Sequence, residues 1–272
     1  MTRHGFVRGQ MDPGNFWNLR ETVLRMRLQS DGIITGKYKM SKIQTNELYE
    51  LARNDILPFE KLAHQYLSYR YPNSIQPIQV EMDESAILVN PPPTHGQTEK
   101  AQIYHADDIS GTGVTFIISL TDNCLSTYCL STTLYGPDYP TSLSVDRLIS
   151  CDYFANTRGN QDIHSAVRER YRPVCSMSPD DFFEKADGGQ PVPAGHYTAF
   201  SHDTMHAGPS GNHGREVLFL HFRVKSKKRR PHTNIQYRID ALMEVCGYSE
   251  SEREDTYNKW VAAGHWSPYG FA

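Results

Sequence analysis

The chain has 272 residues, with 28 basic and 31 acidic side chains and a formal net charge of −3. This length suits one large domain with a substantial core, and the nearly balanced charge gives no reason to expect a polyanionic partner such as nucleic acid. The N-terminus lacks the apolar core of a signal peptide, and no apolar run approaches the roughly 18 residues that span a membrane, so a soluble, cytoplasmic protein is expected.

The first part of the chain is predicted to be helical. Apolar residues recur at helical intervals over residues 16–28 and again over 45–71. Thr45 stands where an N-cap is expected, and Pro58 is expected to kink or split the second helix. Residues 1–73 are therefore expected to form a supporting layer of helices.

From residue 74 the pattern changes to β-rich segments, which predict a mainly β core over residues 74–225. Short runs rich in β-branched and aromatic residues are typical of strands. The predicted strands are 74–82, 85–90, 101–107, 113–120, 196–201 and 215–224. Helical periodicity returns within 226–272, so a single domain, 1–272, is expected.

A long polar insertion over residues 136–190 interrupts the β-rich part. It is rich in Pro, Asp and Arg and offers only short helices, at 164–171 and 179–186. Segments of this kind inside a compact domain are usually functional or mobile. We expect it to act as a lid that selects the substrate, and a solvated loop is the alternative.

Cysteines and a basic run carry weaker signals. The five cysteines are odd in number and lack a paired spacing, which favours reduced thiols. Zinc at Cys124 and Cys129 is disfavoured because no second Cys/His pair follows at the spacing of a zinc finger. The basic run at 225–230 is interpreted as a solvated strand end, and a nuclear import signal or a phosphate contact there is left open.

A histidine and an aspartate two residues apart mark the strongest candidate site. On an extended segment, His105 and Asp107 point to the same face. Farther along, a strand, a Gly/Pro-rich turn and a second strand are expected to place His206, at the end of the first, beside Arg215, at the start of the second. Two histidines and one carboxylate suit octahedral Fe(II), and the planar guanidinium of arginine grips a carboxylate well. The residues therefore predict a site for iron and an acidic co-substrate.

Other histidines offer alternatives for this site. His202 and His206 form a His-x-x-x-His pair, a spacing that binds zinc on a helix, but the glutamate of metal hydrolases is missing and a turn follows at once. His221 shares a strand face with Arg215. It is expected to be a core histidine, with a place in the pocket wall as the alternative.

His105, Asp107, His206 and Arg215, in this order and in a strand context, resemble the motif of the Fe(II)/2-oxoglutarate-dependent dioxygenase superfamily. The resemblance covers residues 75–225. The motif is similar to both the phytanoyl-CoA-hydroxylase-like and the prolyl-hydroxylase-like branches, and the short spacing from His206 to Arg215 and the Gly214–Arg215 junction favour the second. The resemblance implies an α+β fold. Its mainly β core would be a double-stranded β-helix, a cupin-like jelly roll, flanked by N- and C-terminal helices.

The resemblance also implies the ligands of the site. His105, Asp107 and His206 would be the catalytic metal ligands, with 2-oxoglutarate chelating the iron and O2 completing its coordination. Arg215 would bind the distal carboxylate of 2-oxoglutarate. Ascorbate as a further cofactor is left open.

One position departs from the family pattern. Val217 stands where some relatives place a hydroxyl that also touches the tail of 2-oxoglutarate. That contact must then come from elsewhere, and Tyr128 and Tyr197 are the candidates named from the sequence.

The implied activity is that of an oxidoreductase, a hydroxylase that oxidises a small molecule or an amino-acid or peptide side chain and releases succinate and CO2. Asp107 disfavours halogenation, because halogenating relatives have a small residue there. A nucleic-acid or protein demethylase of the same superfamily and a non-catalytic jelly-roll binding protein are the alternatives. The prime substrate and the oligomeric state are not predicted.

Overall fold

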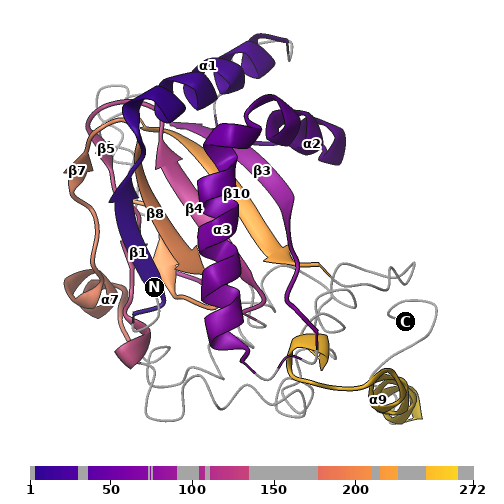
Figure 1. Cartoon of the computed structure of the whole chain (residues 1–272). Helices are drawn as coiled ribbons and strands as arrows, with labels where there is room; N and C mark the ends of the chain where they lie inside the picture. The colour runs from indigo at the N-terminus through magenta and orange to yellow at the C-terminus, as the bar shows by residue number, and fades with distance from the viewer. Residues whose placement is uncertain are drawn as a thin grey trace.

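A six-stranded antiparallel sheet is the centre of the molecule, which is known from a computed structural model (Figure 1). The structure describes residues 4–29, 36–72, 74, 76–90, 104–107, 111–134, 177–209, 215–225 and 243–262. The strand order is β1-β8-β4-β10-β3-β2. The strands are β1 (Phe6–Gln10), β2 (Gly36–Lys39), β3 (Val80–Asn90), β4 (Gly113–Ser119), β8 (His196–Ser201) and β10 (Arg215–Val224). β4 is buried at every residue, as expected for a strand covered on both faces.

Two pairs of short strands lie across from one face of this large sheet. β5 (Cys124–Leu125) pairs with β7 (Pro191–Val192), and β6 (Tyr128–Cys129) pairs with β9 (His206–Ala207). A small buried cluster joins the two walls and consists of Ile117, Phe200 and Val217 from the large sheet and Cys124 and Cys129 from the short strands. This arrangement confirms the predicted α+β class with a jelly-roll core.

Three helices cover the opposite face of the large sheet, as Figure 1 shows. They are α1 (Pro13–Gln29), α2 (Lys42–Leu51) and α3 (Arg53–Arg70). Phe59 of α3 packs on Phe116 of β4, with their ring centroids 4.9 Å apart, and both belong to the larger apolar cluster. Because buried aromatic side chains contribute strongly to core stability, the helical layer supports the sheet from the face opposite the short strands.

The first predicted helix is confirmed by α1, but the second is in fact two helices. The N-cap of α2 is Ser41, whose side chain accepts a hydrogen bond from the Gln44 amide in a capping box. Thr45, predicted as the cap, is buried inside the helix. The break falls at Ala52, ahead of Pro58, which lies inside α3, so the proline does not separate the helices.

The strand predictions hold for β4, β8 and β10 and fail in two places. Predicted strands 74–82 and 85–90 are one strand, β3. Residues 104–107, the described part of another predicted strand, form only a single β-bridge, between His105 and His206. The short strands of the second wall were not predicted, because two residues show no alternation.

The remaining described elements are short or peripheral. They are the 3-10 helix η1 (Thr132–Leu134), α7 (Pro179–Lys185) and α9 (Glu250–Ala262). α7, capped by Ser178, confirms the second predicted helix of the insertion, and α9 agrees with the helical pattern near the end of the chain. The other predicted helix of the insertion, 164–171, and the basic positions 226–230 lie outside the described residues.

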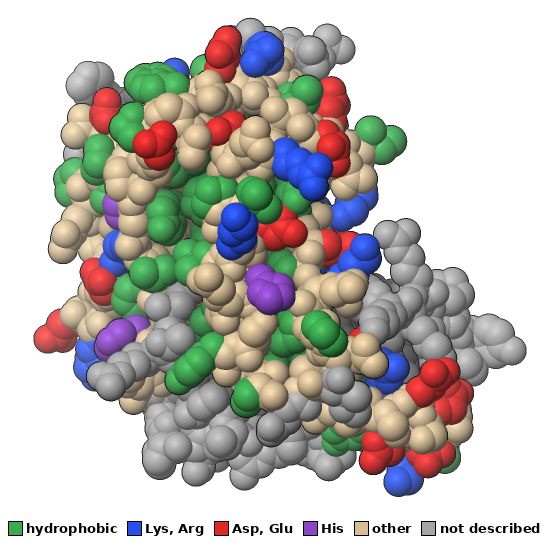
Figure 2. Space-filling model, in the orientation of Figure 1, with side chains coloured by type: hydrophobic (Ala, Val, Ile, Leu, Met, Phe, Trp, Pro, Cys, Tyr) green, Lys and Arg blue, Asp and Glu red, His purple; other side chains and the backbone are tan. Residues whose placement is uncertain are grey.

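Two properties of the described surface bear on partners. No helix in the described part of the chain is long and apolar enough to cross a membrane. On the face shown in Figure 2, the acidic and basic side chains that are described are interspersed. This agrees with the small net charge, and the described side chains on that face form no extended basic patch.

Candidate metal centre

The three predicted metal ligands converge on one point. One ligand atom from each of His105, Asp107 and His206 lies within 4.8 Å of the others. Oδ1 of Asp107 lies 3.6 Å from Nε2 of His206 and 3.9 Å from Nε2 of His105. Two imidazole nitrogens and one carboxylate oxygen are the donor set that suits non-haem Fe(II), with coordination positions left over for other ligands.

Backbone pairing fixes the two histidines relative to each other. The amide of His105 donates to the carbonyl of His206 at 2.9 Å, the reverse bond is 2.8 Å, and the ring centroids are 4.5 Å apart. The sequence predicted that His206 ends the strand that begins near His196, and this is wrong. That strand, β8, ends at Ser201, and a buried turn leads from it to β9. The ligand therefore stands in the wall of short strands.

Hydrogen bonds from outside the triad orient two of its members. Oδ2 of Asp107 accepts from Oγ1 of Thr115 at 2.8 Å, which leaves Oδ1 facing the histidines. Nδ1 of His206 lies 2.9 Å from the carbonyl oxygen of Thr204. Since a carbonyl only accepts, Nδ1 carries the proton and Nε2 offers its lone pair. Partners of this kind fix the tautomer and ring direction of metal-binding histidines.

Burial sets the charges of the site. It lowers the pKa of His206 to about 4, so this imidazole is neutral near pH 7, as a metal ligand must be. Burial acts to raise the pKa of Asp107, but the neighbouring histidines, His206 first, outweigh it and hold that pKa well below its usual range. Both groups are therefore in the protonation state that a metal ion requires.

His202 and His221 form a second group around the same aspartate. Ligand atoms of Asp107, His202 and His221 also lie within 4.8 Å of one another. The Thr115 hydroxyl, which donates to Oδ2 of Asp107, lies 3.0 Å from Nδ1 of His221. The Thr115 hydroxyl therefore links the aspartate to one histidine of the second group. His221, expected as a core histidine, is partly buried and supports the site through Thr115.

Arg215 is a buried cation at the start of β10. The residue is 5% exposed, and its Nη2 donates to Oγ1 of Thr127 at 2.8 Å. Among the described residues no carboxylate pairs with it, and its Nε is buried without a hydrogen-bond partner. Burial lowers its pKa to about 10, so it is still charged at neutral pH. A buried charge without a counter-ion is costly, so the arrangement suits an anionic ligand.

The sequence predicted that His206 and Arg215 lie on neighbouring paired strands, and this prediction is wrong: β10 pairs with β3 and β4, and β9 pairs with β6. Arg215 begins β10 of the large sheet, whereas His206 begins β9 of the small wall. Thr127, which bonds to Arg215, lies two residues before Cys129, and Cys129 pairs with His206.

The two tyrosines named from the sequence lie elsewhere. Tyr197 is on the helix-covered face of the large sheet, with its ring centroid 5.3 Å from that of Phe59. Tyr128 packs against Phe183 of α7, at 4.9 Å between ring centroids. The hydroxyl beside Arg215 belongs instead to Thr127. Sequence analysis missed it because no local pattern surrounds it and only the pairing of β6 with β9 brings it to the site.

Comparisons with known proteins concern the fold. No protein-family profile and no curated protein matches the chain. Among solved structures it is similar to the epimerase SnoN in complex with Fe3+, α-ketoglutarate and nogalamycin RO, with a TM-score of 0.50, 12% identity, and coverage of 81% of this chain and 79% of that one. It is also similar to EvdO2 from Micromonospora carbonacea var. aurantiaca complexed with 2-oxoglutarate, with a TM-score of 0.48, 14% identity, and coverage of 84% and 91%. The chain therefore shares its jelly-roll fold with SnoN.

Proposed function

We propose that the protein is an Fe(II)- and 2-oxoglutarate-dependent oxygenase that oxidises a small molecule or an amino-acid or peptide side chain and releases succinate and CO2. The observation that carries this proposal is the joint placement of the triad and the buried guanidinium of Arg215, which has no carboxylate partner in the described chain. A triad alone would suit several metals. The buried cation, whose partner Thr127 stands two residues before the Cys129 that pairs with His206, adds the need for an acidic co-substrate.

The triad would hold the iron through Nε2 of both histidines and Oδ1 of Asp107. Bound Fe(II) supplies the activation of dioxygen that is coupled to decarboxylation of 2-oxoglutarate. The Thr115 hydroxyl keeps Oδ2 of Asp107 engaged, and the Thr204 carbonyl holds the Nδ1 proton of His206. The chain thereby presents three donors and leaves positions for the co-substrate and dioxygen.

Arg215 and Thr127 would bind the distal carboxylate of 2-oxoglutarate. The guanidinium donates in a planar fork, and the Thr127 hydroxyl, which accepts one bond from Arg215, has its own proton to donate to the same carboxylate. Phe200 and Val217 are fully buried in the interior cluster. Their apolar side chains keep water away from the co-substrate, which strengthens its charged hydrogen bonds.

Among the candidate classes of prime substrate, we favour small molecules. SnoN, whose fold the chain shares, is an epimerase whose complex contains nogalamycin RO. Since that activity is an epimerisation, product analysis must follow inversion of stereocentres as well as hydroxylation. Halogenation is disfavoured in this proposal because the Asp107 carboxylate occupies the position that a halide would need.

Iron binding and succinate release test the proposal. Protein reconstituted without oxygen should bind one equivalent of Fe(II), and a panel of metabolites and peptides should contain a compound that stimulates release of succinate from 2-oxoglutarate. His105→Ala should lose both properties, whereas His64→Ala, an exposed histidine of α3, should keep them. A folded wild-type protein with no affinity for iron would favour the competing class, a non-catalytic jelly-roll binding protein.

A further inference from the structure

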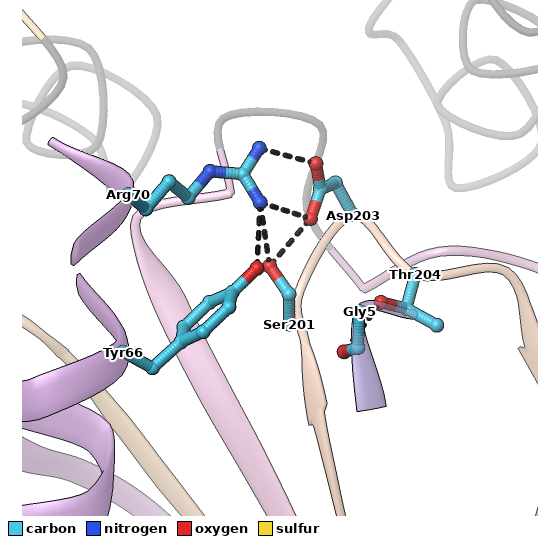
Figure 3. Close-up of polar contacts among 6 residues, drawn as sticks. All are labelled: Gly5, Tyr66, Arg70, Ser201, Asp203 and Thr204. Carbon is cyan, nitrogen blue, oxygen red and sulfur yellow. Dashed lines mark hydrogen bonds and ion pairs between the residues drawn. The ribbon is translucent and has the colours of Figure 1, made fainter. Parts of the chain in front are cut away.

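A buried network ties helix α3 to the turn that precedes His206 (Figure 3). The turn, residues 201–205, connects β8 to β9, and all of its residues are buried. The carboxylate of Asp203 accepts two hydrogen bonds from Arg70, with Nη1 to Oδ1 at 3.0 Å and Nη2 to Oδ2 at 2.6 Å. Arg70 is the last residue of α3. A two-bonded pair of this kind fixes direction as well as distance.

Further hydrogen bonds and close packing surround the pair of Arg70 and Asp203. Nη1 of Arg70 also contacts the hydroxyls of Tyr66 at 3.0 Å and Ser201 at 3.1 Å, and the Ser201 hydroxyl donates to Asp203. Gly111, with φ of +62°, leaves space for the guanidinium, since a Cβ there would lie 2.7 Å from Nη2. The side chain of Arg70 is 3% exposed and that of Asp203 is fully buried. Because the cost of burying two charges can exceed their attraction, stability alone explains such a pair poorly.

The turn transmits this arrangement to the metal centre. The amide of Thr204 donates to the carbonyl of Ser201 at 2.8 Å, and its hydroxyl donates to the carbonyl of Gly5 at 3.0 Å. Both bonds, together with the Asp203 pair next to them, fix the peptide unit whose carbonyl faces Nδ1 of His206 at 2.9 Å. That carbonyl decides which imidazole nitrogen carries the proton.

We propose that Arg70 and Asp203 are positioning residues for the metal centre: they hold the 201–205 turn so that the Thr204 carbonyl keeps His206 in the Nδ1–H tautomer, with Nε2 directed at Asp107. The inference rests on the proposed metal role of His206. Neither residue of the pair is a ligand, so their effect is on the affinity and geometry of the site. Helix α3, which lies outside the jelly roll, thereby contributes to metal binding.

Metal affinity provides the first test, with Co(II) as a probe that is stable in air. Asp203→Asn removes the charge and keeps the shape, and it should weaken Co(II) binding by about tenfold or more, in the range found for residues that support metal ligands. Ile56→Ala, a fully buried position near the other end of α3, should lower stability without changing the Co(II) affinity of the folded protein. Ser201→Ala removes one contact to Asp203 and keeps the ion pair, so it should fold and show a smaller loss of affinity.

The tautomer of His206 provides a second test that needs no metal. In the wild-type apoprotein, nitrogen-15 NMR of the imidazoles should show the proton of His206 on Nδ1. In Asp203→Asn or Ser201→Ala that preference should weaken, and in Ile56→Ala it should persist. Unchanged Co(II) affinity and an unchanged tautomer in both turn variants would overturn the inference. Failure of the wild type to bind Co(II) would instead overturn the proposed function, while the tautomer measurement still judged the positioning network.

Discussion

In the proposed function, the single buried guanidinium of Arg215 selects an acidic co-substrate. In the proposed complex Arg215 pairs with the co-substrate and not with the iron. Arg215→Gln should raise the 2-oxoglutarate requirement strongly and leave Co(II) affinity nearly intact, since losing a charged partner in a buried site costs roughly 2 to 5 kcal/mol, at least about 30-fold in affinity. Arg215→Lys should recover only part, because an ammonium cannot reproduce the fork. Steady-state kinetics with varied 2-oxoglutarate measures both, and an unchanged requirement would remove Arg215 from the site.

The hydroxyl beside Arg215 makes a smaller contribution that can be isolated. Thr127→Val keeps the shape of the side chain and removes its proposed hydrogen bond to the co-substrate, together with the one it accepts from Arg215. The affinity for 2-oxoglutarate should fall about fivefold, in line with roughly 1 kcal/mol for the bond to the ligand. Calorimetric titration of the metal-loaded protein measures this change. Thr22→Val is a matched control, because the Thr22 hydroxyl is bonded within α1 at 3.0 Å, away from the site. Equal affinities in wild type and Thr127→Val, or a large loss in Tyr197→Phe, would contradict our assignment.

The two histidines near Asp107 in the β8–β9 region can be separated by substitution. His206→Ala should lose Co(II) and Fe(II) binding while the protein stays folded, because it removes one of only three proposed ligands. His202→Ala should retain metal, since His202 is not one of the three proposed ligands, whose Nε2 and Oδ1 atoms lie close to one another. Metal content after dialysis, with circular dichroism as the check on folding, distinguishes them. The reverse pattern would move the centre to the second group of ligands.

At the scale of elements, the cap of α2 should matter for stability and not for the site. Ser41→Ala removes the side chain that caps the helix, which should lower the free energy of unfolding by about 1 kcal/mol. Asn46→Ala, an exposed position in the same helix, should change it by less than about 0.5 kcal/mol. Urea unfolding measures both. A loss of Co(II) affinity in Ser41→Ala would show that α2 is coupled to the metal centre, against expectation.

Element length explains which parts of the fold could be predicted from the sequence. α1, β4, β8 and β10 are long enough for a helical or apolar pattern to be visible, and they were predicted. The strands of the second wall have two residues each, and only pairing with distant segments defines them. The same limit applies to the site. The candidate ligands were found by residue type and spacing, but Thr127, Thr115 and Asp203 are brought there by tertiary contacts that no local pattern announces.

At the scale of the whole molecule, the two faces of the large sheet have different tasks. The helix-covered face packs against α1, α2 and α3 through residues of the larger apolar cluster. The other face encloses a small cluster and the polar groups of the candidate site. Arg70 connects the two, because it leaves the helical layer and bonds to the turn before β9. Substitutions in the helical layer should therefore change stability without changing metal affinity, except at Arg70 and the residues it contacts.

Ligand-linked stability tests this organisation in the intact protein. A ligand that binds only the folded state stabilises it by about 2.7 kcal/mol at a concentration 100 times its Kd. Co(II) should therefore raise the unfolding temperature, and 2-oxoglutarate should raise it further only when metal is present, because one end of the co-substrate is held by the metal. In Arg215→Gln, the rise in unfolding temperature caused by Co(II) should remain and most of the rise caused by 2-oxoglutarate should be lost. His206→Ala should lose both rises, and EDTA should reverse them in every variant that shows them. Equal stabilisation by 2-oxoglutarate with and without metal would mean that it binds independently of the triad, and the proposed shared site would be incorrect.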